Sequence, residues 1–596
     1  MREYSIPALA EIPASANAAD VVTRRAAEQP HAVMLRRKTA DGTWSDVTAA
    51  QFAAEVQALA RGFIAAGMQA GDRIALISHT RYEWTLIDYA LWTAGAIVVP
   101  IYETSSAEQA EWILGNSEAR AVIAENDKFA SMISGARDRL PALEHLWLLD
   151  TDLPALIEGG PDVSDETVKA RAQGATDIAT IIYTSGTTGR PKGCELTHEN
   201  LLAAVRNAFM GPLASIHADG TATTLLFLPL AHVFARVIEV GTLEAGIVLG
   251  HCPDMNDLLP DLGSFQPTFV LAVPRVFEKV YNGAEARAAG EGKGKIFARA
   301  AQVAVSYSES LDSARGAGFA LRAQHALFDR LVYGKLRAAL GGKAEWAISG
   351  GAALAPRLGH FFRGIGVSIL EGYGLTETTA PVSVNRPDRQ KIGSVGQPLP
   401  GVAVRIGDDG EVLVRGRSIF PAYWRDETAT KDAFTDGWYA TGDIGELDDE
   451  GFLTITGRKK EIIVTAGGKN VAPSVLEDRM RMHALISQCM VVGDGRPFIG
   501  VLVTIDPEAF GPWKERLGKP ASATVADLRD DPDLNAEVQA AVDDANQAVS
   551  RAESIRKFRI LDGDFTQEQG HLSAKLGIKR AVLAKEFAHE IDALYS

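Results

Sequence analysis

The sequence Ile178-Ala-Thr-Ile-Ile-Tyr-Thr-Ser-Gly-Thr-Thr-Gly-Arg-Pro-Lys-Gly193 decides the fold that we expect, because an apolar run leads directly into a loop of glycine and threonine. The apolar run predicts a buried strand, and Thr197-His-Glu-Asn200 predicts the start of a helix after the loop. Glycines and small hydroxyl residues allow backbone N–H groups to approach a polyphosphate, and a lysine adds a positive charge. We therefore expect a phosphate-binding loop that contains Thr184, Ser185, Gly186, Thr187, Thr188, Gly189 and Lys192.

Helical and β-rich segments alternate around this loop, from about residue 48 to residue 300. Such alternation predicts parallel α/β layers, with ligand loops at the ends of the strands. Further buried strands are predicted at Leu225–Leu230, Phe269–Val273, Trp346–Ile348 and Val367–Leu370. The loop is not that of a P-loop NTPase, because it lacks the spacing GxxxxGK[ST].

The rest of the chain divides into three regions that differ in their predicted secondary structure. Val280–Gly341 predicts a packed helical insert, whose apolar face has four-residue spacing at Phe328, Val332, Leu336 and Leu340. Gly393–Thr456 is β-rich and punctuated by glycine, which predicts a small barrel or distorted sheet. After Gly457 a separate unit is expected, with a hairpin at Met490–Ile505, an acidic helical stretch at Ala521–Glu553 and a final amphipathic helix.

Length and composition exclude several classes of protein. A chain of 596 residues is expected to form at least two domains, and 46% apolar with 23% charged residues is typical of a globular protein. The net charge of −16 disfavours binding to nucleic acid. Three distant cysteines without a CxxC pair predict neither a zinc cluster nor a disulfide framework, which favours the cytoplasm. No signal peptide or transmembrane segment is predicted, and peripheral membrane contact stays open.

Two further motifs place polar residues after predicted strands. Ser349-Gly350-Gly351 follows one strand, and Glu371-Gly-Tyr-Gly-Leu-Thr-Glu-Thr378 follows the next. Tyr373 can stack on a flat base, and Thr376 can bond a phosphate oxygen. Glu377 can hold Mg²⁺, which prefers carboxylate and phosphate oxygens.

Together these motifs resemble those of the adenylate-forming superfamily, which includes acyl-CoA synthetases, luciferases and peptide-synthetase adenylation domains. The segment TSGTTGRPKG at residues 184–193 is similar to the phosphate loop of that family, and the remaining motifs follow in the family's order along nearly the whole chain. The resemblance implies an ATP site with Mg²⁺ on Glu377 and Thr184. It also implies that the nucleotide is bound by Gly350, Gly351, Tyr373, Gly374 and Thr376.

The resemblance extends to the boundary between the two expected domains. Asp443 is an acceptor suited to the two hydroxyl groups of a ribose, and the family places a ribose ligand there. Arg458 would contact the nucleotide, and Lys460 would be the hinge about which the C-terminal domain swings. The glycine-rich segment Ala466–Val471, with Gly467, Gly468 and Lys469, resembles the segment that lines the pantetheine tunnel of coenzyme A.

His232 follows a predicted strand, and the resemblance makes it a gate beside the substrate carboxylate. A histidine packed in the core is the alternative. With Pro274-Arg275-Val276-Phe277 after another strand, we favour a wall of the acyl pocket.

The position of the family's catalytic lysine has two alternatives in His571-Leu-Ser-Ala-Lys-Leu-Gly-Ile-Lys-Arg580. A luciferase-like spacing selects Lys575. Alignment without gaps from the terminal helix puts Gly577 at that position, and Lys579 would then supply the cation. We expect Lys575 to act, because a loop shifts by two residues more easily than the chemistry loses its charge.

The expected fold is α/β. Residues 1–459 would form a large domain of parallel α/β layers with a small β-rich subdomain, and residues 460–596 a smaller, mobile α+β domain. The total length, the helical insert and Val99-Pro-Ile-Tyr-Glu-Thr-Ser105 look like bacterial long-chain fatty acyl-CoA synthetases. The resemblance thus implies a fatty acid–CoA ligase with ATP, Mg²⁺ and coenzyme A. Two alternatives stay open: an acyl-AMP ligase that loads a carrier protein, and a non-catalytic nucleotide- and acyl-binding protein.

Overall fold

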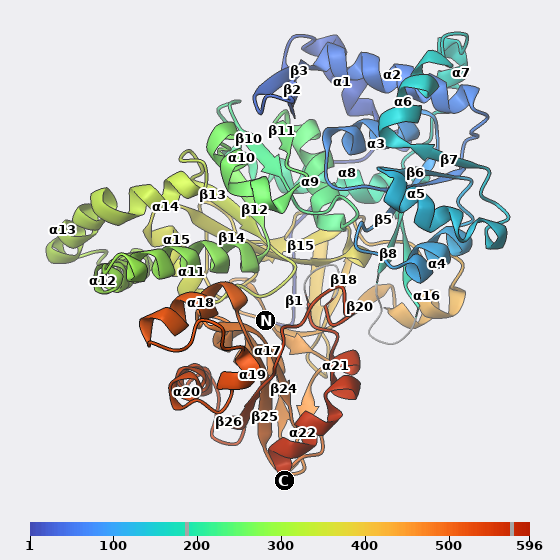
Figure 1. Cartoon of the computed structure of the whole chain (residues 1–596). Helices are drawn as coiled ribbons and strands as arrows, with labels where there is room; N and C mark the ends of the chain where they lie inside the picture. The colour runs from blue at the N-terminus through green and yellow to red at the C-terminus, as the bar shows by residue number, and fades with distance from the viewer. Residues whose placement is uncertain (185–189, 573–576) are drawn as a thin grey trace.

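A computed structural model describes residues 1–184, 190–572 and 577–596 (Figure 1). Two hydrophobic cores account for most of the buried apolar residues. The larger core extends along the chain from Ala18 to Leu453, and a second core extends from Ile463 to Ile560. The C-terminal unit, coloured orange to red, lies below the larger N-terminal unit in Figure 1.

The expected phosphate loop leaves the edge of a six-stranded sheet of order β7-β6-β4-β5-β8-β9. All neighbours in this sheet are parallel except β8 and β9. Its strands are β4 (Arg73–Ile77), β5 (Ile97–Ile101), β6 (Ala121–Ala124), β7 (His145–Leu148), β8 (Ile178–Thr184) and β9 (Lys192–Thr197). Its layer contains the helices α2 (Ala49–Ala65), α3 (Tyr82–Thr93), α4 (Ala107–Ser117), α5 (Asp127–Ser134), α6 (Leu149–Glu158) and α7 (Asp165–Lys169).

The expectation that a helix follows the loop directly was incomplete. Strand β9 comes first, because Cys194 and Leu196 alternate with polar residues and are fully buried beside β8. Helix α8 (His198–Met210) then begins at Thr197, whose side chain accepts from the N–H of Asn200 in a capping box.

A second sheet has the order β12-β13-β14-β15-β16, of which β12, β13 and β14 are parallel. Its strands are β12 (Phe269–Ala272), β13 (Trp346–Ser349), β14 (Ser368–Leu375), β15 (Ala380–Val384) and β16 (Gln397–Pro398). The three predicted strands in this sheet are confirmed, but β14 continues through Glu371-Gly-Tyr-Gly-Leu375. The motif therefore lies on the strand, because it pairs with β15.

A third sheet of order β10-β11-β2-β3 completes the layers. It contains β2 (Val33–Lys38), β3 (Trp44–Thr48), β10 (Thr223–Leu226) and β11 (Val248–His251). Strand β10 ends four residues before the predicted end at Leu230, because the chain turns at Pro229 toward helix α9. The neighbouring helices are α1 (Asp20–Glu28), α9 (Val233–Ala245) and α10 (Leu258–Phe265).

The predicted β-rich region is an antiparallel sheet, to which the N-terminal strand adds at one edge. It contains β1 (Glu3–Ser5), β17 (Val402–Ile406), β18 (Glu411–Gly416), β19 (Phe434–Thr435), β20 (Trp438–Leu447) and β21 (Leu453–Arg458), with α16 (Glu427–Ala433) beside it.

The predicted helical insert is confirmed. It contains α11 (Pro274–Gly290), α12 (Gly294–Leu311), α13 (Phe319–Phe328) and α14 (Gly334–Ala339), and α15 (Pro356–Gly364) packs against α12. A π-helical turn, Asp329–Tyr333, joins α13 to α14. Leu336 and Leu340 are buried, and Phe328 and Val332 pack against the same core, as the four-residue spacing predicts.

The C-terminal unit is α+β. Its sheet has the order β24-β25-β26, and the predicted hairpin is formed by β24 (Ile486–Val492) and β25 (Ile499–Ile505). The other elements are β22 (Ile463–Val464), β23 (Asn470–Val471), α17 (Pro473–Met480), α18 (Pro507–Arg516), α19 (Val525–Leu528), α20 (Pro532–Asn546), β26 (Ile555–Ile560), α21 (Arg580–Glu586) and α22 (Ala588–Tyr595). Across the described residues, no helix has both the length and the apolar character needed to cross a bilayer.

Candidate active site

One large cavity of about 3200 Å³ lies where the two units meet. Its walls come from the carboxyl ends of strands in two sheets, from β20 and β21, and from the C-terminal unit. Most of the sequence-predicted site residues outside the undescribed segments contribute to this one cavity. It is the place where a parallel α/β layer normally binds ligands.

The two ends of the phosphate loop are firmly attached to the surrounding structure. The Tyr183 hydroxyl donates to Asn116 Oδ1 at 2.6 Å, and Trp112 Nε1 donates to the Pro191 carbonyl at 2.9 Å. Thr184 and Arg190 line the cavity, so both ends of the loop open onto it. Ser185, Gly186, Thr187, Thr188 and Gly189 lie outside the described residues.

Lys192 and Glu377 are brought together by an aromatic residue that the sequence did not point to. The ammonium group of Lys192 lies 5.2 Å from the ring centre of Tyr423, and the Tyr423 hydroxyl donates to Glu377 Oε1 at 2.9 Å. The backbone of Glu377 accepts from the N–H of Phe420 at 2.8 Å. Glu377 is half-buried and is not among the described residues that line the cavity, whereas its neighbour Thr376 is.

The expected adenine wall lies at the ends of β13 and β14. Gly350, Gly351, Tyr373 and Gly374 all line the cavity. At Gly374 a side chain is excluded, because a Cβ atom would lie 1.8 Å from the carbonyl oxygen of Ala380. Burial, together with the neighbouring carboxylate of Asp443, raises the pKa of the Tyr373 hydroxyl far above its ordinary value, so this group is a permanent donor.

Asp443 is buried and already holds two partners. The Tyr373 hydroxyl donates to its Oδ2 at 2.6 Å, and Arg458 Nε lies 2.9 Å from its Oδ1. Burial raises the pKa of Asp443, and the Arg458 guanidinium opposes this shift. The predicted nucleotide residues Tyr373, Asp443 and Arg458 thus form one connected group on three strands.

Lys460, the predicted hinge, follows a residue that is held by the N-terminal unit. Lys459 Nζ bonds Asp409 at 2.6 Å and Glu411 at 2.8 Å, and its backbone N–H donates to Gly442. Lys460 itself is exposed and lines the cavity. The last fixed point of the N-terminal unit therefore lies immediately before the predicted hinge.

Glu371 is a buried carboxyl group in the cavity wall that the sequence did not assign. It accepts from the Leu354 N–H at 2.9 Å, and the residue is 7% exposed. Burial raises the pKa of Glu371 to about 8, with a further contribution from the charge of Asp478 on α17. The group is therefore protonated near neutral pH and can donate a hydrogen bond into the cavity.

An apolar branch of the cavity lies beside His232, between α8 and α9. His232 caps the N-terminus of α9, and its Nδ1 accepts from the Phe234 N–H at 3.0 Å. In the neutral ring this bond assigns the proton to Nε2. The branch is lined by Ala208, Phe209, Leu213, Val233, Val237 and Ile238.

The C-terminal unit contributes the segment that contains both alternatives for the catalytic lysine. Residues 577–582 line the cavity, including Gly577 and Lys579, and so do Gln567, Glu568, Gly570 and Leu572. Lys575 lies outside the described residues. Arg580 anchors the following helix, because its guanidinium bonds the buried carboxylate of Glu477 and the Val491 carbonyl.

The glycine-rich segment lies elsewhere on the C-terminal unit. Residues 466–469 are exposed, and none of these four described residues lines the cavity. Lys469 Nζ instead lies 3.4 Å from Glu553 within the same unit. In this structure Gly467, Gly468 and Lys469 are therefore separate from the nucleotide residues.

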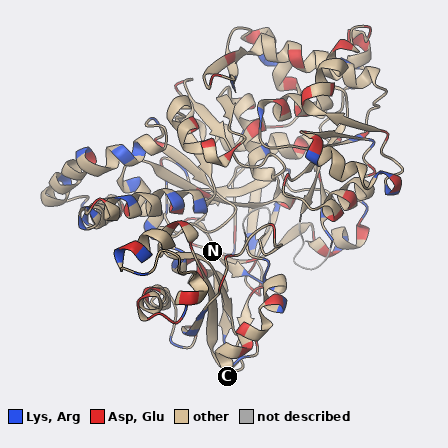
Figure 2. Cartoon of the chain, in the orientation of Figure 1, with Lys and Arg blue, Asp and Glu red and all other residues tan. Residues whose placement is uncertain are grey.

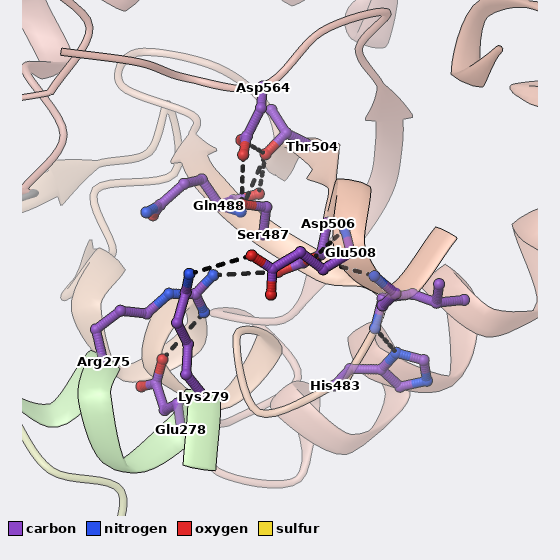
Figure 3. Close-up of polar contacts among 12 residues, drawn as sticks. Arg275, Glu278, Lys279, His483, Ser487, Gln488, Thr504, Asp506, Glu508 and Asp564 are labelled. Atoms are coloured by element: carbon purple, nitrogen blue, oxygen red, sulfur yellow. Dashed lines mark hydrogen bonds and ion pairs between the residues drawn. The ribbon is translucent and has the colours of Figure 1, made fainter. Parts of the chain in front are cut away.

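Ion pairs join α11 of the N-terminal unit to α18 and its N-cap residue on the C-terminal unit (Figure 3). Arg275 lies 3.4 Å from Asp506 and Lys279 lies 3.6 Å from Glu508, and Figure 3 shows these four side chains pointing toward each other across the interface. Arg275 and Asp506 are each 18% exposed, and Arg275 also bonds Glu278 at 3.2 Å. Partial burial and a shared partner make the Arg275 contact stronger than the exposed Lys279 pair.

Sequence reasoning missed the residues that support the site. Tyr423, Trp112 and Glu371 lie far from the quoted motifs, or carry no motif role, and their contacts depend on the packing of distant segments. Only Glu371 could have been noticed in the sequence. It is the first residue of a quoted motif, and a carboxyl group directly after a buried strand is unusual.

Sequence comparisons place the chain among known enzymes. The family profile described as AMP-binding enzyme matches residues 22–424, and the profile of the AMP-binding enzyme C-terminal domain matches residues 460–596. The chain is 53% identical to the long-chain-fatty-acid–CoA ligase FadD15 of Mycobacterium bovis over 100% of both chains. It is 30% identical to the long-chain-fatty-acid–CoA ligase ACSBG2 of Xenopus laevis, over 94% of this chain and 81% of the relative.

Solved structures share the fold at lower identity. The o-succinylbenzoate CoA synthetase of Bacillus subtilis, in complex with ATP and magnesium ion, has a TM-score of 0.67 at 19% identity, over 94% of this chain and 98% of the other. The A domain of carboxylic acid reductase from Segniliparus rugosus, in complex with AMP and a carboxylic acid, has a TM-score of 0.73 at 21% identity, over 98% and 94%.

Proposed function

The chain belongs to the AMP-binding enzyme family, and we infer that it is a long-chain fatty acid–CoA ligase that forms AMP. The full-length match to FadD15 is the observation that carries this inference. The cavity agrees with it, because a polar nucleotide end and an apolar branch meet beside His232. ATP, a fatty acid and coenzyme A are the substrates.

In the first half-reaction an oxygen of the fatty acid carboxylate attacks the α-phosphorus of ATP. The bond from that phosphorus to the bridging oxygen breaks, which yields acyl-AMP and pyrophosphate. Two anions must approach each other, so cations have to be positioned before the reaction. We assign this role to Lys192 and to a lysine of the segment 567–582, with Lys575 as our choice and Lys579 as the alternative.

We assign the nucleotide to the connected group at the strand ends. Tyr373 would stack on the adenine beside Gly350 and Gly351, and Asp443 with Arg458 would hold the ribose. Thr376 and the loop of residues 184–189 would bind the phosphates through hydroxyl and backbone N–H groups.

Glu377 fits a magnesium ion, because Mg²⁺ needs only one or two protein carboxylates when phosphate oxygens supply the other ligands. Within the described residues no three His, Cys, Asp or Glu side chains converge on one point, so the nucleotide would have to complete the coordination, with the hydroxyl of Thr184. Tyr423 orients one oxygen of Glu377 and leaves the other available. When bound, the ion would neutralise charge on the triphosphate.

In the second half-reaction the sulfur of coenzyme A attacks the acyl carbonyl carbon. The bond to the AMP oxygen breaks, so that AMP leaves and the thiol proton is released. We propose that the C-terminal unit rotates about Lys460 between the two steps, which removes residues 567–582 and brings Gly467 and Gly468 to the cavity.

We place the protein in the cytoplasm. Its three cysteines are buried and lie far apart in the sequence, which suits a reducing compartment.

The test is a screen of fatty acids by chain length for AMP release that depends on free coenzyme A. We expect long-chain acids to support it, and the same acids to support ATP–pyrophosphate exchange without coenzyme A. Exchange without CoA-dependent AMP release would instead identify an acyl-AMP ligase that loads a carrier protein. Absence of exchange with every acid would identify a non-catalytic binding protein.

A further inference from the structure

Helix α13 and the π-helical turn after it present an apolar face that the rest of the described chain does not cover. Phe319 is 85% exposed, Leu327 is 55% exposed and Leu331 is 54% exposed. Helix α13 contains no buried residue, although it is ten residues long. Exposed large apolar side chains are ordinary when scattered, but a contiguous group of them marks an interaction surface.

The exposed apolar residues recur with helical spacing. Phe319, Ala323, Ala326, Leu327 and Leu331 are all exposed and follow each other at intervals of one, three or four residues. The opposite side of the same helices packs on the core through the residues of the predicted insert face, described above. The segment therefore has two apolar sides. One side packs on the core, and the other has no partner within the described chain.

The charge of this region opposes that of the whole chain. Residues 319–343 contain five Lys or Arg and one Asp or Glu, whereas the chain carries a net charge of −16. The single acidic residue, Asp329, is paired with Arg337 at 2.7 Å. Arg322 and Arg330 are exposed and form no ion pair within the described residues. Figure 2 shows Lys and Arg gathered along this arm, which projects from the body of the molecule in Figure 1.

We propose that helices α13 and α14 form a surface that docks on an anionic lipid bilayer. An apolar helix face flanked by cations is the arrangement that lies in the plane of a membrane interface. The aliphatic stems of Arg322, Arg330 and Lys335 would lie along the acyl region while their charged ends reach the phosphates. The acidic remainder of the protein is repelled by the same lipids, so this arm is the part that approaches the bilayer.

The test is co-sedimentation of the full chain with vesicles of phosphatidylcholine alone or of phosphatidylcholine with phosphatidylglycerol. We expect binding to the anionic vesicles that weakens as salt is raised, and little binding to neutral vesicles. Each cation near the surface contributes about fivefold in affinity. The variant R322E/R330E should therefore lose on the order of 30-fold or more, and F319S/L327Q/L331Q should lose a similar factor.

Matched controls keep the change in charge and hydrophobicity but move it to other surfaces. R551E/K431E alters two exposed cations elsewhere, and L259Q/L517Q alters leucines that are 55% and 41% exposed. Both controls should bind vesicles like the unchanged protein. Because every substituted side chain is exposed, circular dichroism should show the same fold in all variants.

Two results would overturn the proposal. One is equal binding of all variants to anionic vesicles, which would mean that another surface carries the contact. The other is no binding to either vesicle together with a dimer in sedimentation equilibrium that F319S/L327Q/L331Q converts to monomer, which would make the face an interface between two copies.

Discussion

The C-terminal unit has two loops to which we assign roles in catalysis, and only one of them lines the cavity. Gln567, Glu568, Gly570, Leu572 and residues 577–582 line the cavity, whereas residues 466–469 are exposed and lie outside it. Both loops belong to one small unit and lie on different parts of it. The glycine-rich loop can therefore reach the cavity only if the unit changes its orientation. Under the proposal of two orientations, this is the arrangement for acyl-AMP formation, and the glycine-rich loop would enter the cavity only after the unit rotates.

Contacts with α11 and the β-rich sheet maintain this orientation. Arg275 and Lys279 bond Asp506 and Glu508 on the C-terminal unit, and Lys459 fixes the chain just before Lys460. Few contacts of this kind have to break for the unit to turn, because two of the four interface side chains are largely exposed.

Replacement of the lysine that we assign to catalysis should produce the largest loss of activity, and it should slow only one of the two half-reactions. Lys575→Ala is expected to lower acid-dependent ATP–pyrophosphate exchange by about 10²- to 10³-fold, because a cation that faces the α-phosphate is lost. Conversion of supplied acyl-AMP to acyl-CoA should persist. The matched variant Lys579→Ala separates the two alternatives for this lysine, since unchanged exchange in Lys575→Ala with loss in Lys579→Ala would select Lys579.

A change at the hinge should have the opposite effect. Lys460→Pro is expected to leave acyl-AMP formation largely intact and to slow thioester formation by about 10²-fold, because a small error in placing the reacting groups costs this much. The measurement is the accumulation of acyl-AMP in rapid-quench samples. Lys460→Ala, which keeps the backbone free to rotate, should accumulate far less, and equal accumulation in both would argue against a hinge at this residue.

Much of this arrangement could be predicted from sequence, for identifiable reasons. The strand that begins at Ile178 and the helix start at Thr197 follow from local patterns, and so does the helical insert. Strand β9 was missed because it is a short segment with only two fully buried apolar side chains, and the motif at Glu371 was placed on a loop although it pairs with β15.

Site residues that belong to a sequence motif could be predicted. Site residues that reach the site only through the packing of distant segments could not. Tyr373, Asp443 and Arg458 are far apart in sequence, but each lies in a quoted motif, and they converge where β14 meets the antiparallel pair β20 and β21. Tyr423 lies beside Glu377 because the segment after β18 pairs with β9 through an antiparallel bridge between Tyr423 and Cys194, and no local pattern encodes that pairing. Which loop of the C-terminal unit faces the cavity also depends on contacts between domains.

Reversal of charge at the interface should have a smaller effect on which of the two loops faces the cavity. Arg275→Glu is expected to reduce acyl-AMP formation by about tenfold, because it replaces a partly buried attraction to Asp506 with repulsion. Thioester formation from supplied acyl-AMP should be unchanged or faster. Arg287→Glu, an exposed change on the same helix, is the control. Equal loss of both half-reactions in Arg275→Glu would show that the contact does not select an orientation.

A change in the apolar branch should affect both reactions alike. A Cβ atom at Gly241 would lie 2.3 Å from the ring of Phe209, so Gly241→Ala should push that ring into the branch. We expect the preference among fatty acids to shift by about tenfold toward shorter chains. The ratio of the two half-reactions should stay constant for any one acid. An unaltered chain-length profile would exclude this branch as the acyl site.

The smallest expected effect concerns the buried carboxyl group of Glu371. Its folded-state pKa of about 8 lies above its ordinary value of 4.5, so the folded protein holds a proton that the unfolded chain releases, and stability falls as pH rises between these values. Glu371→Gln should remove this dependence, at most about 1.4 kcal/mol per pH unit, while stability at pH 5 is preserved. Urea unfolding at pH 5 and 8 measures it. An undiminished slope in the variant would assign the pH dependence to other groups.

The most direct test of the two-orientation account is to lock the C-terminal unit in place. The three native cysteines are buried, so cysteines introduced at Arg275 and Asp506 are the reactive pair for a short bis-maleimide. Both half-reactions are then measured on the cross-linked protein. The account predicts that the locked protein still carries out acid-dependent ATP–pyrophosphate exchange but no longer converts acyl-AMP and coenzyme A to acyl-CoA. Formation of acyl-CoA by the cross-linked protein at the rate of the uncross-linked protein would contradict it.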